Sequence, residues 1–302
     1  MPTDAPPPTE AMVDIDGARI WTSQQGTPSP AAGGQPPAMV MIHGGPGLWE
    51  DFGPLAEMVD DLVEVYRYDQ RGSGRSDRVG PYDIATAVAD LEALRKQWWR
   101  PKLILVGHSF GAALALAYAV EHPEHVAALI LISGTGVDLE WKEEHKAEAA
   151  ARRSPDDRNR LAELHIQRAA GVWNEAVDRE FCALTWATDF ADRKHDLDRA
   201  AALYRAPGPN YEMNSAMTAD WARMLLDGFA DRVSGIAAPV LLMNGVGDPR
   251  PLSATARLAL RLPNAELAIL DDCGHFPWLE QPEVTRLTLR EFLSDLLDEP
   301  ED

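Results

Sequence analysis

Cysteine is scarce in this chain, with only Cys182 and Cys273 among 302 residues. Two cysteines so far apart give neither a zinc-binding spacing nor a disulfide framework. The sequence also lacks an apolar run of the roughly 18 residues that a membrane span requires. Residues 1–10 are rich in proline and lack the basic and apolar regions of a signal peptide, so we expect a disordered tail and a cytoplasmic protein. No pattern indicates a metal or another cofactor.

Positive charge is also in short supply, because 28 lysines and arginines stand against 48 aspartates and glutamates and leave a net charge of −20. Such an acidic surface repels the phosphates of nucleic acids and anionic membranes, so neither is an expected partner. Apolar residues make up 45% of the chain and charged residues 25%, which is ordinary for a globular protein. We therefore expect a partner that is a small molecule or a short peptide, and the sequence leaves the oligomeric state open.

Short apolar runs alternate with helical segments along most of the chain. Strand-like runs occupy residues 38–42, 62–68, 102–106, 126–132, 239–243 and 265–270, and helical segments occupy 84–98, 112–120, 253–261 and 282–297. Residues 11–24 are typical of a hairpin and 26–37 of a loop. This alternation predicts an α/β fold with a mostly parallel sheet and helices on both faces.

The alternation stops between residues 137 and 230. This segment is charged and rich in alanine, and its apolar residues have helical spacing. We therefore predict a helical cap at 137–230, inserted into a core formed by residues 11–136 and 231–302.

The pentapeptide Gly107-His108-Ser109-Phe110-Gly111 lies between a predicted strand and a predicted helix. In that context the pattern G-x-S-x-G is typical of a nucleophile elbow, a sharp turn that exposes the serine hydroxyl above the sheet. The alternative is a glycine-rich turn that carries an ordinary serine. The flanking strand and helix favour Ser109 as a nucleophile.

A serine nucleophile requires a general base and an acid that orients the base, and in this fold class they follow in the order acid, then histidine. Asp248 and His275 have that order, and each follows a predicted strand, where the sites of open α/β sheets lie. Taken alone, Asp248 could cap a turn and His275 could lie on a surface loop. Asp271 and Asp272 are rival acids, but they are too close in sequence to His275 to span the sheet.

Acyl transfer also requires hydrogen-bond donors for the developing oxyanion. The backbone N–H of Phe110 is one candidate, and that of Gly45, in the segment 43–47, is the other. A plain tight turn is the alternative for this glycine segment. Residues 69–76 also contain glycines and arginines, but they lack G-x-G-x-x-G spacing and a Walker lysine, so we expect a supporting loop rather than a phosphate site.

Several motifs together resemble a known family. They are His43-Gly-Gly-Pro-Gly47, Asp69-Gln-Arg-Gly-Ser-Gly-Arg-Ser76, the serine elbow, Gly247-Asp248 and Cys273-Gly-His275. Across roughly residues 12–297 the chain resembles the proline iminopeptidase-like serine hydrolases (peptidase family S33 type) of the α/β-hydrolase superfamily. The resemblance implies an eight-stranded sheet, a helical cap over the active site, a Ser-Asp-His triad and no cofactor.

The chain departs from this family where related aminopeptidases hold the free amine of the substrate. A carboxylate typically follows a Gly-Pro-Asn in the cap, but here Tyr211 has that place and Glu212 comes one residue later. A second carboxylate often follows the triad acid, and that position is Pro249. The elbow also differs, since the family has glycine and tryptophan where His108 and Phe110 flank the serine.

Because of these departures, we consider three functional hypotheses. The leading one is a serine hydrolase that cleaves a small ester or amide through an acyl-enzyme. One alternative is a true proline iminopeptidase on short peptides, with Glu212 holding the amine. The other is a non-catalytic ligand-binding protein on a hydrolase fold, which a complete triad argues against. Trp49, Tyr211 and Trp221 are candidate substrate contacts, with core packing as their alternative role.

Overall fold

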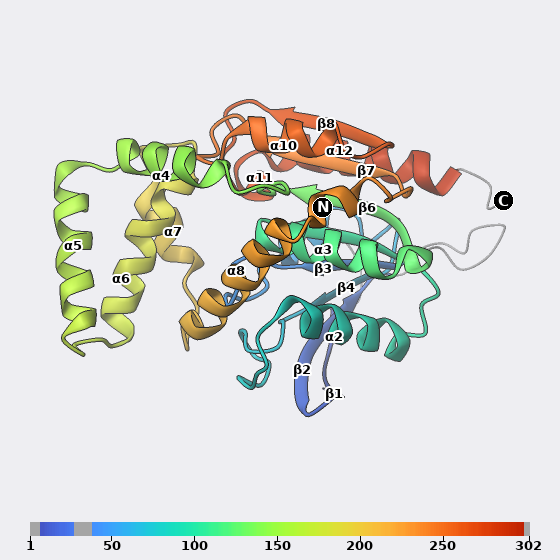
Figure 1. Cartoon of the computed structure of the whole chain (residues 1–302), viewed down its shortest axis with the longest axis horizontal. Helices are drawn as coiled ribbons and strands as arrows, with labels where there is room; N and C mark the ends of the chain where they lie inside the picture. The colour runs from blue at the N-terminus through green and yellow to red at the C-terminus, as the bar shows by residue number, and fades with distance from the viewer. Residues whose placement is uncertain (1–6, 27–37, 299–302) are drawn as a thin grey trace.

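Eight strands form one sheet in a computed structural model of the chain, which describes residues 7–26 and 38–298 (Figure 1). The strands are β1 (Thr9–Ile15), β2 (Ala18–Gln25), β3 (Ala38–Ile42), β4 (Val65–Tyr68), β5 (Leu103–His108), β6 (Val126–Ile132), β7 (Val240–Gly245) and β8 (Ala265–Leu270). Their order across the sheet is β1-β2-β4-β3-β5-β6-β7-β8. Strand β2 is antiparallel to β1 and β4, and the remaining pairs are parallel. The predicted mostly parallel, eight-stranded sheet is confirmed.

The first hairpin starts earlier than we predicted. Thr9 and Glu10 belong to β1 and pair with residues of β2, so the predicted tail of residues 1–10 is two residues too long. Ladder hydrogen bonds with β2 order these two residues. Residues 1–6 of that tail lie outside the described residues, as do positions 27–37 of the predicted loop.

Alternate residues of the central strands point to opposite faces of the sheet, and both faces are buried. In β3, Val40 and Ile42 join one apolar cluster, whereas Met39 and Met41 join the other. The first face is covered by α2 (Ile84–Gln97), α3 (Phe110–Glu121) and α10 (Leu252–Ala259), and the second by α1 (Gly53–Ala56), α11 (Pro277–Glu280) and α12 (Pro282–Asp298). This confirms helices on both faces.

Helices alone connect β6 to β7. They are α4 (Trp141–Arg152), α5 (Pro155–Ala169), α6 (Glu175–Trp186), the 3₁₀ turn η2 (Ala187–Asp189), α7 (Asp196–Leu203), α8 (Tyr211–Leu226) and α9 (Phe229–Val233). Figure 1 shows α4–α7 projecting to one side of the sheet, and we refer to α4–α7 together with η2 as the cap. Helix α9 crosses the predicted boundary between residues 230 and 231.

Helix α8 packs on the core instead of projecting with the cap. Met213, Met217 and Trp221 lie in the same apolar cluster as the buried residues of α3. The backbone N–H of Asn210, which caps α8, donates to the carbonyl of Gly47 (2.8 Å). Side-chain amides extend this attachment, from Asn210 to Gly72 and from Asn214 to Pro46 (3.0 Å each). The start of α8 is therefore bonded to two loops of the core.

Candidate active site

Ser109 lies at the turn between β5 and α3, in backbone geometry that side chains rarely adopt. Its φ is 55° and its ψ is −118°, and it is the N-cap residue of α3. Its N–H donates to the carbonyl of Ile132 at the end of β6 (2.9 Å). A non-glycine residue at positive φ costs free energy that the surrounding structure has to supply. Such an outlier at a serine fits the strained elbow that the sequence predicts.

The two glycines of the pentapeptide are required by close packing. A Cβ on Gly107 would fall 2.7 Å from Cα of Ala112 and would overlap the carbonyl of Gly111. A Cβ on Gly111 would overlap the carbonyl oxygen of Ile42 in β3. The turn from strand to helix is thus too tight for a side chain at position 107 or 111, two residues before and two residues after Ser109.

Asp248 and His275, which the sequence places after β7 and β8, are in direct contact. Nδ1 of His275 lies 2.7 Å from Oδ2 of Asp248, and both side chains are buried. Burial by itself would raise the pKa of Asp248, but the neighbouring His275 ring and Arg250 guanidinium lower it below its ordinary value. The carboxylate is therefore ionised and is suited to orient and stabilise an imidazolium.

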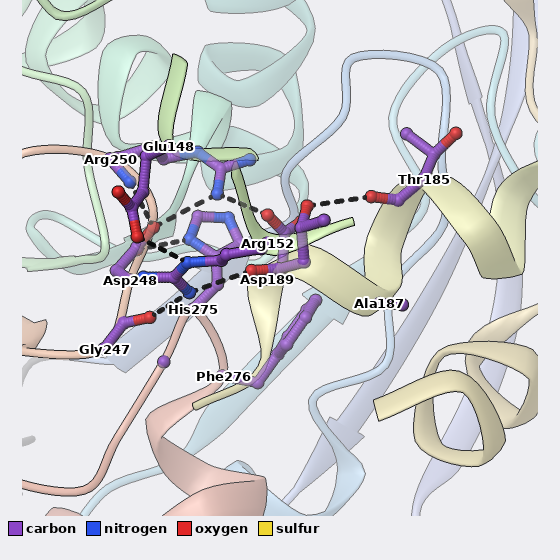
Figure 2. A network of polar contacts seen from close by, with 12 residues as sticks. Glu148, Arg152, Thr185, Ala187, Asp189, Gly247, Asp248, Arg250, His275 and Phe276 are labelled. Carbon is purple, nitrogen blue, oxygen red and sulfur yellow. Dashed lines mark hydrogen bonds and ion pairs between the residues drawn. The ribbon is translucent and has the colours of Figure 1, made fainter. Parts of the chain in front are cut away.

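Two further side chains hold this pair. Arg250 donates to Oδ1 of Asp248 from its backbone N–H (2.9 Å) and from Nη1 (3.2 Å), as Figure 2 shows. Nε2 of His108 donates to the carbonyl of His275 (2.9 Å). Burial keeps the pKa of His108 well below its ordinary value, so this ring is neutral. Arg250 therefore holds the side chain of the acid, and His108 holds the backbone of the base.

A pocket of about 120 Å³ opens at the carboxyl ends of the strands, under the cap. The core lines it with Gly44, Gly45, Leu48, Trp49, Asp51, His108, Ser109, Arg250, His275 and Phe276, and the cap with Trp186, Asp189 and Leu203. The structure thus brings Ser109 and His275 to one cavity.

The predicted oxyanion donors also lie at this end of the sheet. Gly45 lines the pocket and has a φ of 125°, which favours glycine. Phe110 is the first residue of α3, and an N–H in the first turn of a helix has no acceptor within that helix. Both N–H groups therefore come from loops or turns next to Ser109.

The loop at residues 69–76 supports the glycine segment, as the sequence suggests. The backbone N–H of Gln70 donates to Nε2 of His43 (3.0 Å), and its side-chain amide donates to the His43 carbonyl (2.7 Å). Asp69 accepts from the N–H of Glu50 (2.8 Å) and from the side chain of Arg75 (2.6 Å). These bonds tie the loop to His43, at the start of the segment that carries Gly45, and to Glu50, three residues after its end.

Of the predicted substrate contacts, Trp49 lines the pocket and the other three do not. Trp221 faces the core from α8 and packs against Phe229 with ring centroids 5.0 Å apart. Tyr211 donates its hydroxyl to Asp178 within the insertion. Glu212 is exposed on the first turn of α8. The core thus holds Trp221, the cap holds Tyr211 and solvent surrounds Glu212.

The sequence did not single out several pocket residues. Asp51 follows the glycine segment by four positions, and Arg250 follows Asp248 by two. Their closeness to a motif in the sequence could have identified them as pocket residues. Asp189 and Leu203 come from the insertion, where no motif marks them. Cys273, in contrast, is fully buried and its pKa is raised to about 12 by burial, so its thiol is a packed side chain and not a nucleophile.

Residues 39–286 match the Alpha/beta hydrolase family, which covers most of the chain. The chain belongs to this family. It is a hydrolase, and the alternative of a non-catalytic binding protein is set aside. Across residues 7–26 and 38–298, no helix has both the length and the apolar character needed to cross a membrane.

This hydrolase is similar to enzymes named proline iminopeptidase. One from Lactobacillus helveticus is 27% identical over 277 residues, which cover 85% of this chain and 90% of that enzyme. One from Saccharolobus solfataricus is 43% identical over 101 residues, which are 32% of this chain and 33% of that enzyme. The crystal structure of proline iminopeptidase from Mycobacterium smegmatis superposes with a TM-score of 0.68 at 20% identity and covers 96% of this chain and 99% of that chain. At that identity the structural likeness shows the fold alone.

Proposed function

We propose that this hydrolase cleaves a small ester or amide through an acyl-enzyme formed on Ser109, with His275 as general base and Asp248 as the acid that orients it. The observation that carries the proposal is the 2.7 Å bond from His275 to Asp248, next to a pocket that Ser109 and His275 both line. The strained backbone of Ser109 supports the same role, because it holds the hydroxyl above the carboxyl ends of the strands.

In this mechanism Oγ of Ser109 attacks the substrate carbonyl while His275 takes its proton. Asp248 stabilises the resulting imidazolium. The N–H groups of Gly45 and Phe110 donate to the oxyanion of the tetrahedral intermediate. His275 then gives the proton to the leaving group. In the second half of the reaction His275 takes a proton from water, which attacks the acyl-enzyme, and then returns that proton to Ser109 as the acyl group leaves.

Part of the pocket wall is apolar and suits an apolar or aromatic acyl group. Leu48, Trp49 and Phe276 come from the core side, and Trp186 and Leu203 come from the cap. The rings of Trp49 and Trp186 meet edge to face, with centroids 6.1 Å apart. Burial of an acyl chain against these side chains would supply binding energy without directional bonds.

Covalent labelling tests the nucleophile. A fluorophosphonate probe should label the wild-type protein at one residue, and Ser109→Ala should abolish both labelling and hydrolysis of p-nitrophenyl acetate, with kcat lower by roughly 10⁴-fold or more. The circular dichroism spectrum of the variant should match that of the wild type. Undiminished turnover by a folded Ser109→Ala variant would remove this serine from the mechanism.

A second candidate function is removal of an N-terminal proline from a short peptide, as the names of the relatives suggest. An ammonium group under a cap requires a charged partner. Glu212 is exposed and outside the pocket, whereas Asp51 is only partly exposed and lines it. Asp51 is therefore the better candidate for pairing with a free amine.

Two substrates and two variants separate these functions. If the enzyme is an aminopeptidase, it cleaves proline p-nitroanilide, Asp51→Asn lowers kcat/KM for this amine substrate by about tenfold or more, and p-nitrophenyl acetate is little affected. The matched variant Glu212→Gln should change neither rate. Cleavage of the ester alone, with no turnover of the anilide, would leave the esterase or amidase function.

A further inference from the structure

We propose that Arg250 is a positioning residue of this hydrolase, which orients the carboxylate of Asp248 and connects it to Asp189 of the cap. The inference rests on the proposed function, because it requires Asp248 and His275 to act as acid and base. No motif includes Arg250, and the proposed mechanism leaves it without a role.

The carboxylate of Asp248 has a different partner on each oxygen. Oδ2 lies 2.7 Å from Nδ1 of His275, and Oδ1 accepts from the backbone N–H (2.9 Å) and Nη1 (3.2 Å) of Arg250. Rotation of the carboxylate away from His275 would break both bonds to Arg250. The arginine therefore restricts the side chain to the orientation in which it meets the base.

The same guanidinium reaches into the cap. Nη1 of Arg250 also donates to Oδ1 of Asp189 (2.9 Å), which lies on η2. The backbone carbonyl of Asp189 in turn accepts from the N–H of His275 (2.8 Å). Asp189 thus contacts the loop of the acid through Arg250 and the loop of the base directly. Figure 2 shows these groups as one continuous network.

Arg152 of α4 makes a second connection between the same two segments. It donates to the carbonyl of Thr188 in η2 (3.0 Å) and to that of Gly247, the neighbour of Asp248 (2.6 Å). The cap turn and the acid loop are therefore held together at two adjacent points. A change in the position of η2 would act on Asp248 through Arg250.

Arg250 also balances charge around the base. The side chains of Arg250, Asp189 and Asp248 are 14%, 9% and 0% exposed, so water screens their charges poorly. The pKa of Arg250 lies above its ordinary value, because attraction to the two carboxylates exceeds the effect of burial. Loss of this cation would leave two buried carboxylates near His275 and would favour the protonated imidazole.

Other ionisable groups near His275 do not obscure this effect. Burial lowers the pKa of His145 on α4 to about 4 and keeps His108 neutral, so both rings are uncharged above pH 5. Burial raises the pKa of Asp51, in the same pocket, to about 7, so wild type and variants are compared in an Asp51→Asn background. A difference between the pH profiles of wild type and variant therefore reports on Arg250.

The test measures kcat, KM and the pH profile of p-nitrophenyl acetate hydrolysis for Arg250→Met, Arg250→Lys and Arg257→Met. We expect Arg250→Met to lower kcat by roughly 10- to 100-fold with less than about a threefold change in KM. The acid limb of its kcat/KM profile should move up by about one pH unit. Arg250→Lys should restore the acid limb and part of kcat, because it keeps the charge but not the forked geometry.

Arg257→Met is the matched control. Arg257 of α10 donates to Asp138 from Nε (2.7 Å) and Nη2 (3.1 Å), so this variant also loses an arginine–aspartate pair near the start of the insertion. Arg257 and Asp138 do not line the pocket. Its kcat and pH profile should match the wild type within about twofold.

A further variant keeps the proposal testable if Arg250→Met does not fold. Asp189→Asn removes a negative charge, so it should lower kcat while moving the acid limb to lower pH, opposite to Arg250→Met. A folded Arg250→Met with wild-type kcat and pH profile would overturn the proposal, as would acid limbs that move the same way in both variants. If the fluorophosphonate probe does not label wild-type Ser109, the proposed function itself fails, and that result is separate from these outcomes.

Discussion

Gly44 lies directly against Ser109, so that a Cβ on this glycine would come 2.9 Å from the serine Cβ and 3.1 Å from the carbonyl of His108. Gly44→Ala therefore has to displace the proposed nucleophile or the glycine segment. We expect kcat for p-nitrophenyl acetate to fall by about tenfold or more, because small displacements of reacting groups have large effects on rate.

Gly53→Ala provides the control for that substitution. Gly53 begins α1, and the nearest atom to its added Cβ would be Nη1 of Arg67 at 3.8 Å, an ordinary contact. Its kcat should equal that of the wild type. Equal rates for Gly44→Ala and Gly53→Ala would show that Gly44 does not constrain Ser109.

The charge of Asp51 makes stability depend on pH. Burial and the neighbouring Glu50 raise the pKa of Asp51 from 3.8 to about 7. The folded protein therefore binds a proton that the unfolded chain releases between these two values, and stability falls as pH rises through this window. Asp51→Asn should raise the free energy of unfolding by about 2 kcal/mol at pH 8 and by much less at pH 4.

Urea unfolding of wild type and Asp51→Asn at both pH values measures this difference. A stabilisation that is equal at pH 4 and pH 8 would contradict the raised pKa, because a neutral carboxylic acid and an amide differ little at low pH.

A buried ion pair next to the supporting loop should matter more for stability than an exposed one. Arg71 donates to Asp90 from Nε (2.7 Å) and Nη2 (2.6 Å), and both side chains are 6% exposed. Asp90→Asn leaves the buried guanidinium without its counter-ion, so we expect a loss of about 3 kcal/mol in the free energy of unfolding.

Asp61→Asn is the comparison for this loss. Asp61 pairs with Arg290 at 2.6 Å, but the two side chains are 60% and 31% exposed. Its removal should cost about 0.5 kcal/mol, measured by denaturant unfolding under the same conditions. Similar losses for the two variants would mean that burial does not set the strength of these pairs.

Two tryptophans in comparable burial should differ in their effect on activity. Trp49 lines the pocket and Trp221 lies in the core. Trp49→Phe should lower kcat/KM for p-nitrophenyl butyrate by about tenfold, because it removes apolar contact from the acyl pocket. Trp221→Phe should lower the melting temperature and leave kcat/KM of the folded enzyme within about twofold. A reversed pattern would place the acyl pocket on the α8 side.

The fold and the three proposed catalytic residues could be predicted because local sequence carries them. Ser109, Asp248 and His275 each follow an apolar strand, and the carboxyl ends of parallel strands meet at one edge of the sheet. The roles of these three residues stay a prediction until they are tested. Their placement at one edge follows from the parallel direction of the strands, which the alternating pattern indicates.

The rest of the pocket depends on how the insertion packs, which helical spacing does not specify. Trp221 and Trp186 both occur at helical positions, yet one faces the core and the other the pocket. Spacing defines the apolar face of a helix but not the surface that this face meets. For the same reason Glu212 was a candidate beside its motif, whereas Asp51 and Asp189 are the carboxylates that line the pocket.

The bonds from α8 to the core bear on how this enzyme could be recombined with its relatives. Asn210 and Asn214 bond the start of α8 to the glycine segment that carries Gly45, and Asn210 also bonds to Gly72 of the supporting loop, so the glycine segment and α8 form one block. A chimaera that exchanges residues 137–203 and retains α8 would replace the cap side of the substrate pocket while keeping that block. One that exchanges residues 137–230 would also replace α8, so the glycine segment would lose its native anchor.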